Sequence, residues 1–439
     1  MRGLRVSGYI KILRDKSSFF AFFLSSMIWF TPLRTFLIEV GNEFLPGTGR
    51  VLSRISILIF FIYLIYPVFR WVRVTKDCLL ILIFILFQWG RPLIFYTEHI
   101  STWISVLVDF LIKVFPFYVI ARQTTDWNLV KQKLYQGSII AIVLMAVMTI
   151  IKMEKGNLFH ENATYSMFWG FLMGRPSTVM LVAFLDTKKI KYLLMFIISM
   201  PFVILYGTRT PLVCVFFALF LYLLVVMEKS VKEHKVYFDI KNFRLLYLLF
   251  LILIIVIAYA LRSGRERTTD VLSSGQRIIY IITNGGFLKS DGRINIYKIC
   301  IDLIMESPCG GVGILSDRVK IAEQFGGGFI GTYAHNIILE WLLQFGIIVG
   351  GILLLGLGII CWKLLFRTKD RDKRTVSIYL VGFGMSFLML SGTAFDCCEL
   401  YVLLGMGLGS VRVCFRGRCF LDDFEKNRTN QNLMLGAKE

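Results

Sequence analysis

Charged residues and histidines are scarce in this sequence. Asp, Glu, Lys and Arg make up 18% of its 439 residues, there are four histidines, and 56% of the residues are hydrophobic. The sequence has no GxxxxGK[ST] phosphate loop, no strand-linked GxGxxG, and no metal-ligand spacing among its nine cysteines. These absences argue against a protein that uses ATP, a dinucleotide or zinc, so we expect no cofactor and no metal.

Long apolar stretches are abundant instead. The mean hydropathy is +0.68, and apolar runs recur at roughly the 17–25 residues that a helix needs to cross a bilayer. We therefore expect an all-α, polytopic integral membrane protein. About twelve spans are predicted, near residues 18–33, 53–69, 77–92, 102–120, 137–152, 166–185, 190–207, 210–227, 244–261, 336–362, 375–392 and 395–414.

The distribution of basic residues predicts the orientation. Lys and Arg number 49 against 29 Asp and Glu. Most of them lie in the two ends and in "RWVRVTK", "LDTKKIK", "EKSVKEHK" and "FRTKDRDKR", which all face the cytoplasm if both termini do. The basic excess suits anionic membrane lipids. We expect no nucleic-acid partner, because no folded basic domain is visible.

One predicted outer loop is much longer than the others. The domains we expect are the helices of residues 1–261, a large extracytoplasmic loop at 262–335, the last three spans at 336–414 and a basic cytoplasmic tail at 415–439. Within the loop, "DGRINIYKICIDLIMESPCGG" has apolar residues at helical spacing, namely Ile294, Tyr297, Ile301 and Ile304, and Pro308 stops the run. We predict a helix there, at the membrane surface. A disulfide between Cys300 and Cys309 stays open.

Arginines gather at the predicted outer face. Arg209, in "LYGTRTPLV", occupies the short turn between the seventh and eighth spans, and Arg293 falls in the first turn of the loop helix. A guanidinium beside a helix N-terminus favours an anion such as a diphosphate. The alternatives are an arginine that snorkels to the lipid interface and plain surface charge. Arg265, after the ninth span, is a further candidate, although such arginines often contact only headgroups.

His335 and Asn336 stand where "YAHNIILEWLLQFG" enters the tenth span, on the same predicted side as Arg209 and Arg293. The imidazole titrates near neutral pH, which suits proton transfer from an attacking hydroxyl. The alternative is an interfacial polar residue without a chemical role. We predict that His335 and the two arginines line one cavity open to the outer leaflet, and that Asn336 orients the imidazole or a sugar.

Four other polar residues are weaker candidates. Arg175, inside the sixth span, is expected to point to the same cavity. Glu306 ends the loop helix, where it competes with His335 as a base but is more simply explained as solvated. Asp370 and Asp372 resemble the acidic pair of metal-dependent sugar transferases, but they lie in a basic turn and are expected to be a solvated charge run.

Three stretches carry a resemblance to a known family. "YGTRTPLV", "GRINIYKICIDLIMESPCGGVGI" and "YAHNIILEWLLQFGIIVGG" resemble the bacterial O-antigen polymerase and O-antigen ligase superfamily, with similarity mainly over residues 165–365. The family's His-Asn pair followed by a glycine matches His335, Asn336 and Gly346. Its two arginines match Arg209 and Arg293.

The resemblance implies a metal-independent, inverting glycosyltransferase with a GT-C-like fold in the bacterial inner membrane, its active site facing the periplasm. The donor would be a glycan on undecaprenyl diphosphate. The acceptor would be a sugar hydroxyl on another lipid-linked repeat unit in a polymerase, or lipid A–core in a ligase. His335 would be the catalytic base, and a chain-length regulator is a further expected partner. We favour the polymerase; the ligase stays open, as does a transporter or flippase for lipid-linked oligosaccharides.

Overall fold

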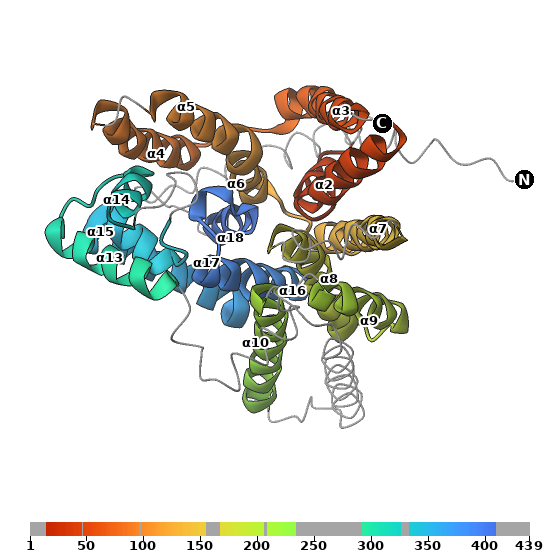
Figure 1. The fold of residues 1–439 in the computed structure, drawn as a ribbon. Coiled ribbons are helices and arrows are strands. Elements are labelled where there is room, and N and C mark those ends of the chain that lie inside the picture. Colours follow the sequence, from red (N-terminus) through yellow and green to blue (C-terminus); the bar gives the residue numbers. More distant parts are fainter. Residues whose placement is uncertain are drawn as a thin grey trace, which may run out of the picture.

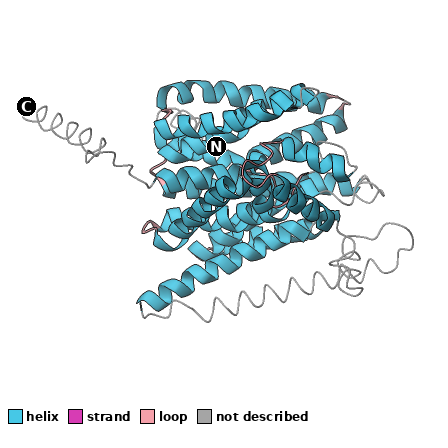
Figure 2. Ribbon diagram, turned by 90° about the vertical axis from the view of Figure 1, so that its left-hand side faces the viewer, coloured by secondary structure: helices cyan, strands magenta, loops and turns pink. Residues whose placement is uncertain are grey.

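Almost all of the described chain is helical. The computed structural model describes residues 15–45, 47–95, 99–154, 167–205, 209–233, 292–325 and 333–409, and within these ranges it contains no strand. Figure 1 views the helices close to end-on, and Figure 2 shows most of them crossing the molecule in one general direction. A helical bundle is the arrangement expected in a bilayer, because each helix satisfies its own backbone hydrogen bonds.

The helices follow the predicted spans closely. The first part of the chain forms α2 (Lys16–Phe44), α3 (Thr48–Trp71), α4 (Lys76–Phe95), α5 (Ile100–Asp109), η2 (Phe110–Val114), α6 (Phe115–Gln123), α7 (Trp127–Glu154), α8 (Met167–Thr187), α9 (Ile190–Leu205) and α10 (Arg209–Glu233). The last part forms α13 (Gly292–Glu306), α14 (Ser316–Phe325), α15 (Ile337–Trp362), η5 (Lys363–Arg367), α16 (Arg371–Tyr379), η6 (Leu380–Met385), α17 (Ser386–Leu390), η7 (Ala394–Asp396) and α18 (Cys398–Gly409). Each predicted span overlaps one of these helices or a consecutive run of them, except 244–261, which lies outside the described residues.

The surface of the bundle is apolar enough for lipid. Large hydrophobic side chains are exposed along its outer helices, among them Leu58, Ile62, Leu80, Phe87, Ile348 and Leu355. Six of the described helical stretches are long and apolar enough to cross a membrane: Lys16–Glu43, Ile100–Gln123, Trp127–Ile151, Phe168–Thr187, Thr210–Lys229 and Ile337–Arg367. The protein is thus a polytopic membrane protein; twelve spans, a GT-C-like arrangement and the orientation stay predictions.

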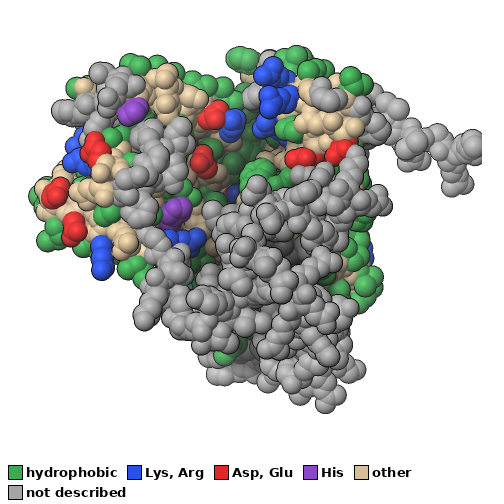
Figure 3. All heavy atoms as spheres, in the orientation of Figure 1, with side chains coloured by type: hydrophobic (Ala, Val, Ile, Leu, Met, Phe, Trp, Pro, Cys, Tyr) green, Lys and Arg blue, Asp and Glu red, His purple; other side chains and the backbone are tan. Residues whose placement is uncertain are grey.

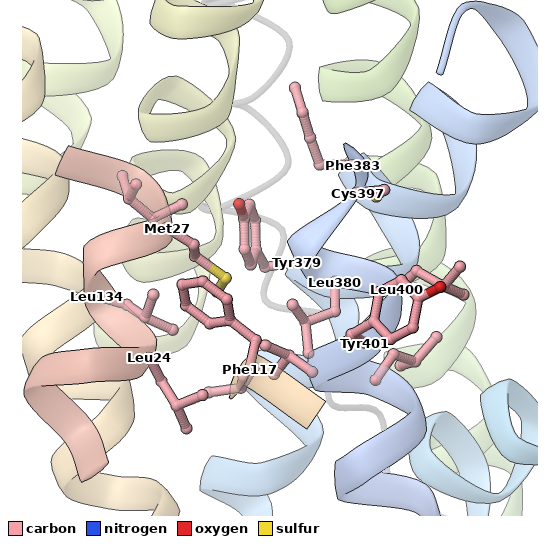
Figure 4. Close-up of a cluster of buried hydrophobic side chains, with 14 of the residues drawn as sticks. Leu24, Met27, Phe117, Leu134, Tyr379, Leu380, Phe383, Cys397, Leu400 and Tyr401 are labelled. Atoms are coloured by element: carbon pink, nitrogen blue, oxygen red, sulfur yellow. The ribbon is translucent and has the colours of Figure 1, made fainter. Parts of the chain in front are cut away.

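The hydrophobic core is formed by helices from both the first and the last part of the described chain. Figure 4 shows one cluster of buried side chains that come from α2, α6, α7, α16, η6 and α18: Leu24, Met27, Phe117, Leu134, Tyr379, Leu380, Leu400 and Tyr401. In Figure 1, α16 and α18 lie in the middle of the molecule, with the earlier helices around them. The C-terminal helices are therefore held by packing from several sides.

Side-chain caps and ion pairs set helix ends on the predicted cytoplasmic side. Asp370 caps α16, because its Oδ1 accepts from the backbone N–H groups of Asp372 at 2.9 Å and Lys373 at 3.1 Å. Asp372 pairs with Lys131 of α7, and Lys131 also lies 2.9 Å from Asp186 of α8. Asp370 is exposed, as the interpretation of a solvated charge run requires. For Asp372 that interpretation was incomplete, because Asp372 is half-buried and its pairing with Lys131 joins α16 to α7.

The helix predicted in the long loop is present as α13, but a different face of it is buried. Ile304 is buried as the spacing suggested, whereas Ile301 is 51% exposed and the rest of the buried face is formed by Ile296, Cys300 and Leu303. This face packs on α14, a second helix that the sequence analysis did not predict, and on the first turns of α15. Cys300 is fully buried while Cys309 is exposed, and both are free thiols.

Candidate functional site

The starts of three helices meet at Ser391, in the turn after α17. Arg293 of α13 donates from Nη2 to Ser391 Oγ at 3.3 Å. Thr210 of α10 shares a 3.3 Å hydrogen bond with the same hydroxyl. Tyr333, shortly before α15, donates from its hydroxyl to Ser391 O at 2.5 Å. Together with Asn336, these residues form what we call the Ser391 junction. The guanidinium of Arg293 and the hydroxyls that meet here are groups that can bind an anion.

His335 lies at the edge of this junction in a constrained conformation. Its φ is +52°, in the left-handed region that non-glycine residues seldom adopt. Its ring centroid is 3.9 Å from that of Tyr333, with the planes tilted by 42°. Burial raises the pKa of Tyr333 to about 12, so the phenol stays protonated and keeps its bond to Ser391. The imidazole therefore lies against Tyr333, whose hydroxyl is bonded to Ser391, the residue that Arg293 also contacts.

Asn336 is the N-cap of α15. Its Oδ1 accepts from the N–H groups of Ile338 at 2.9 Å and Leu339 at 3.3 Å, while its Nδ2 donates to Met389 O at 3.4 Å. Both ends of the amide are thus engaged with the protein. The structure shows a positioning role for Asn336 that ties the start of α15 to the end of α17; contact with substrate stays a prediction.

The two remaining predicted arginines are placed differently. Arg209 is the first residue of α10 and directly precedes Thr210 of the junction. Arg265 lies outside the described residues. One cavity lined by His335, Arg209 and Arg293 therefore stays a prediction. The described members of the junction come from α10, α13, the segment that leads into α15 and the turn after α17.

Arg175 does not belong to the junction. Its Nε lies 3.0 Å from Oε1 of Glu399, a side chain that is 1% exposed. Its guanidinium also lies 5.6 Å from the centre of the Phe387 ring. The expectation that Arg175 points to the same cavity was wrong, because it pairs with Glu399 inside the bundle. Glu306, the last residue of α13, is exposed, as its explanation by solvation requires.

Three buried charged side chains outside the predicted site, Glu340, Asp317 and Arg318, lie near the junction. Glu340 is 2% exposed and accepts from Thr393 Oγ1 at 2.5 Å and Ala394 N at 3.1 Å, which fixes the segment that follows Ser391. Asp317 of α14 is fully buried, and burial raises its pKa to about 6. The adjacent Arg318 guanidinium lies 5.5 Å from the Tyr333 ring centre. No spacing signal marked Asp317 and Arg318, because α14 itself was not predicted.

α15 is broken a few residues after the junction. Gly346 has φ +79° and ψ 170°, which is not helical. The loop after α13 fits into the break: Pro308 O accepts from Ile347 N at 2.7 Å, and Val312 N donates to Leu343 O at 2.8 Å. The break leaves a short helix that carries His335 and Asn336 at its start, followed by a longer helix toward Trp362. The glycine of the predicted signature thus has a structural reason.

An arginine from α4 holds the inserted loop. Arg91 donates from Nη1 to Gly310 O at 2.7 Å and from Nη2 to Gly311 O at 3.0 Å. A planar guanidinium suits two neighbouring carbonyls, so a single side chain fixes the turn that fills the break. Arg91 therefore supports the position of α15 from outside the junction.

The end of the bundle shown in Figure 3 carries histidine, basic and acidic side chains among hydrophobic ones. Among the described residues, no group of three or more His, Cys, Asp or Glu is placed to hold a metal ion. The chemistry available at the junction is an imidazole, guanidinium groups, hydroxyls and helix N-termini. Such a set can bind an anion and accept a proton.

Part of the chain that contains this arrangement is similar to a known family. Residues 194–355 match the model of a family described as O-antigen ligase. This part of the chain confirms the resemblance to the O-antigen polymerase and ligase superfamily. Arg209, Arg293, His335, Asn336 and Gly346 all fall inside the matched range. No curated protein and no solved structure matches the chain.

Proposed function

We propose that this member of the O-antigen polymerase and ligase superfamily is a polymerase of surface-polysaccharide repeat units. It would transfer a glycan from undecaprenyl diphosphate to a sugar hydroxyl on another lipid-linked glycan, at the periplasmic face of the bacterial inner membrane. The observation that carries the proposal is the Ser391 junction, where His335 lies beside the contacts of Arg293 and the start of α10.

The proposed reaction divides the work between a base and cations. The acceptor hydroxyl attacks the anomeric carbon while His335 takes its proton, and the bond from that carbon to the diphosphate oxygen breaks. The diphosphate leaves with the electron pair, and its growing negative charge is stabilised by Arg293, Arg209 and the helix N-termini. Inversion follows because attack comes from the side opposite the leaving group. Tyr333 and Asn336 position the base.

The ligase is the second candidate, and the description of the matched family favours it. It would use the same base, cations and donor, with a hydroxyl of lipid A–core as acceptor. The Ser391 junction serves either acceptor equally well. A transporter of lipid-linked oligosaccharides is less well supported, because it needs no base beside its anion site.

The test is a deletion strain complemented with wild type, His335→Ala or His99→Ala, with its surface glycan separated on a gel. His99 is a matched control: it is the other histidine of the described residues, and it occupies the N-cap position of α5 without a side-chain capping bond, outside the matched family range. Loss of a general base slows transfer by roughly 10²–10⁴-fold. We expect His335→Ala to abolish the ladder at normal expression, and His99→Ala to retain it.

The deletion strain distinguishes the functions. Core bearing a single repeat unit indicates a polymerase, and core without repeats, with long chains still on the lipid carrier, indicates a ligase. An unchanged ladder in the deletion strain would contradict both. A normal ladder with His335→Ala would remove the histidine from the reaction.

A further inference from the structure

A second polar site lies at the opposite end of the bundle. A pocket of about 630 Å³ opens where α6 ends, α7 begins and η5 connects to α16. It is lined by Thr124, Thr125, Trp127, Lys363, Arg367, Thr368, Lys369, Asp370 and Lys373. We call it the basic pocket.

The basic pocket is far from the Ser391 junction. The helix from Gly346 to Arg367 and the run from Arg371 to Leu390 both connect the two ends. At a rise of about 1.5 Å per residue, each run of about 20 residues spans roughly 30 Å, which is the thickness of a bilayer core. A ligand in the pocket is therefore separate from any substrate at the junction.

Cationic side chains dominate the lining. Lys363, Arg367 and Lys369 are exposed, and Lys373 is half-buried. The single carboxylate, that of Asp370, already accepts from two backbone N–H groups at the start of α16. Such a surplus of positive charge in one concave site suits a phosphate, which several donors can bind at once.

Lys373 shows that the pocket is partly shielded from water. Its Nζ lies 5.9 Å from the centre of the Trp127 ring, and Trp127 is only 3% exposed. Burial lowers the pKa of the Lys373 ammonium, opposed by the charge of Asp370. An anion held beside this ammonium would compensate for the water that it has lost.

The pocket borders the lipid surface. Trp362, directly before Lys363, is 54% exposed, and its ring centroid lies 4.5 Å from that of Phe366. Aromatic residues next to basic ones are typical of the boundary between hydrocarbon and water. A molecule that enters the pocket from this side has its acyl chains along η5 and its headgroup among the cations.

We propose that the basic pocket binds the phosphate of an anionic phospholipid headgroup. Trp127 and Trp362 mark the interface, Lys363, Arg367 and Lys369 contact the phosphate from the exposed side, and Lys373 contacts it from below. The lipid would stabilise the positions of η5 and α16. These two elements continue along the chain to the Ser391 junction, η5 through α15 to Asn336 and α16 through α17 to Ser391. The proposal does not depend on the reaction catalysed there, or on which leaflet the pocket faces.

The test is native mass spectrometry of the full-length protein in detergent, titrated with phosphatidylglycerol or phosphatidylcholine. We expect one tightly retained phosphatidylglycerol and no tightly retained phosphatidylcholine. The variant Arg367→Gln/Lys369→Gln removes two exposed cations and is expected to weaken retention by roughly tenfold or more. The variant Lys189→Gln/Lys191→Gln changes two exposed cations, one directly before α9 and one in its first turn. It removes the same charge outside the pocket and is expected to bind like wild type.

Three outcomes would overturn the proposal. Equally weakened retention in both double variants would mean that binding of phosphatidylglycerol depends only on the net charge of the protein. Unchanged retention by the pocket variant would place the lipid elsewhere. Displacement of the lipid by millimolar inorganic phosphate, with equally tight binding of phosphate alone, would make the pocket a site for soluble anions.

Discussion

Replacing Gly346 with alanine tests whether the break in α15 holds the functional site together. A Cβ at this position would lie 2.5 Å from the carbonyl oxygen of Cys309 and 2.9 Å from that of Pro308. Both are backbone atoms, so the inserted loop has to move. The φ and ψ of Gly346, +79° and 170°, also belong to a region that only glycine adopts without strain.

The cost can be estimated from these contacts. The backbone strain costs about 1–3 kcal/mol, and displacement of the loop breaks the 2.7 Å bond from Ile347 N to Pro308 O, which adds about 1–3 kcal/mol if the donor stays unsatisfied. Gly346→Ala should therefore destabilise the protein by about 2–6 kcal/mol. The displaced helix start should also lower glycan transfer, since His335 and Asn336 lie on it.

Gly351→Ala is the matched control. Gly351 lies in the same helix, and a Cβ added to it meets nothing within 4 Å. Alanine is a better helix former by about 1 kcal/mol, so this variant should be neutral or slightly stabilised. Thermal unfolding in detergent, followed by tryptophan fluorescence, and the surface-glycan ladder are the two measurements. Equal unfolding midpoints for the two variants, with equal ladders, would refute the reasoning.

Substitutions at three further positions test the surroundings of the junction. Burial raises the pKa of Asp317 to about 6, so ionisation of this carboxyl lowers the free energy of unfolding as the pH rises from about 4 through 6. In thermal unfolding, Asp317→Asn should therefore be as stable as wild type at pH 4. At pH 8 it should be more stable than wild type by on the order of 3 kcal/mol. Asn336→Ala removes the cap of α15, which should destabilise the protein by about 1 kcal/mol and remove most of the glycan ladder. Asn336→Ser keeps a capping oxygen and should keep both the stability and the ladder of wild type. Arg91→Gln removes charge-assisted bonds to Gly310 O and Gly311 O; it should lower the unfolding midpoint, and an unchanged midpoint would argue against loop anchoring.

The fold class could be predicted from the sequence because hydropathy is a local property. An apolar run long enough to cross a bilayer forms a helix wherever it lies, so the predicted spans overlap the described helices. Local signals worked equally well in the long loop, where helical spacing and Pro308 bounded α13. The same spacing gave the wrong face of that helix, since Ile301 is exposed while Cys300 is buried. Which face is buried depends on α14 and α15, whose packing no local pattern contains.

The break in α15 also escaped sequence reasoning. Residues 336–362 read as one uninterrupted span, because Gly346 is compatible with a long apolar helix in a membrane. Only the loop after α13, which approaches from far along the chain, makes a positive φ necessary there. The prediction for Arg175 was wrong for a related reason. Its partner Glu399 lies in α18, and an ion pair between distant helices leaves no spacing signal.

Local patterns in the sequence were enough to predict the helical membrane class. They also singled out Arg209, Arg293, His335 and Asn336, whose order resembles the O-antigen polymerase and ligase superfamily. The contacts of Arg293 and Thr210 with Ser391, and the pairing of Arg175 with Glu399, could be found only in the folded structure. The physical reason is that helix formation and membrane insertion depend on neighbouring residues, whereas the position of one helix start beside another depends on packing across the whole bundle.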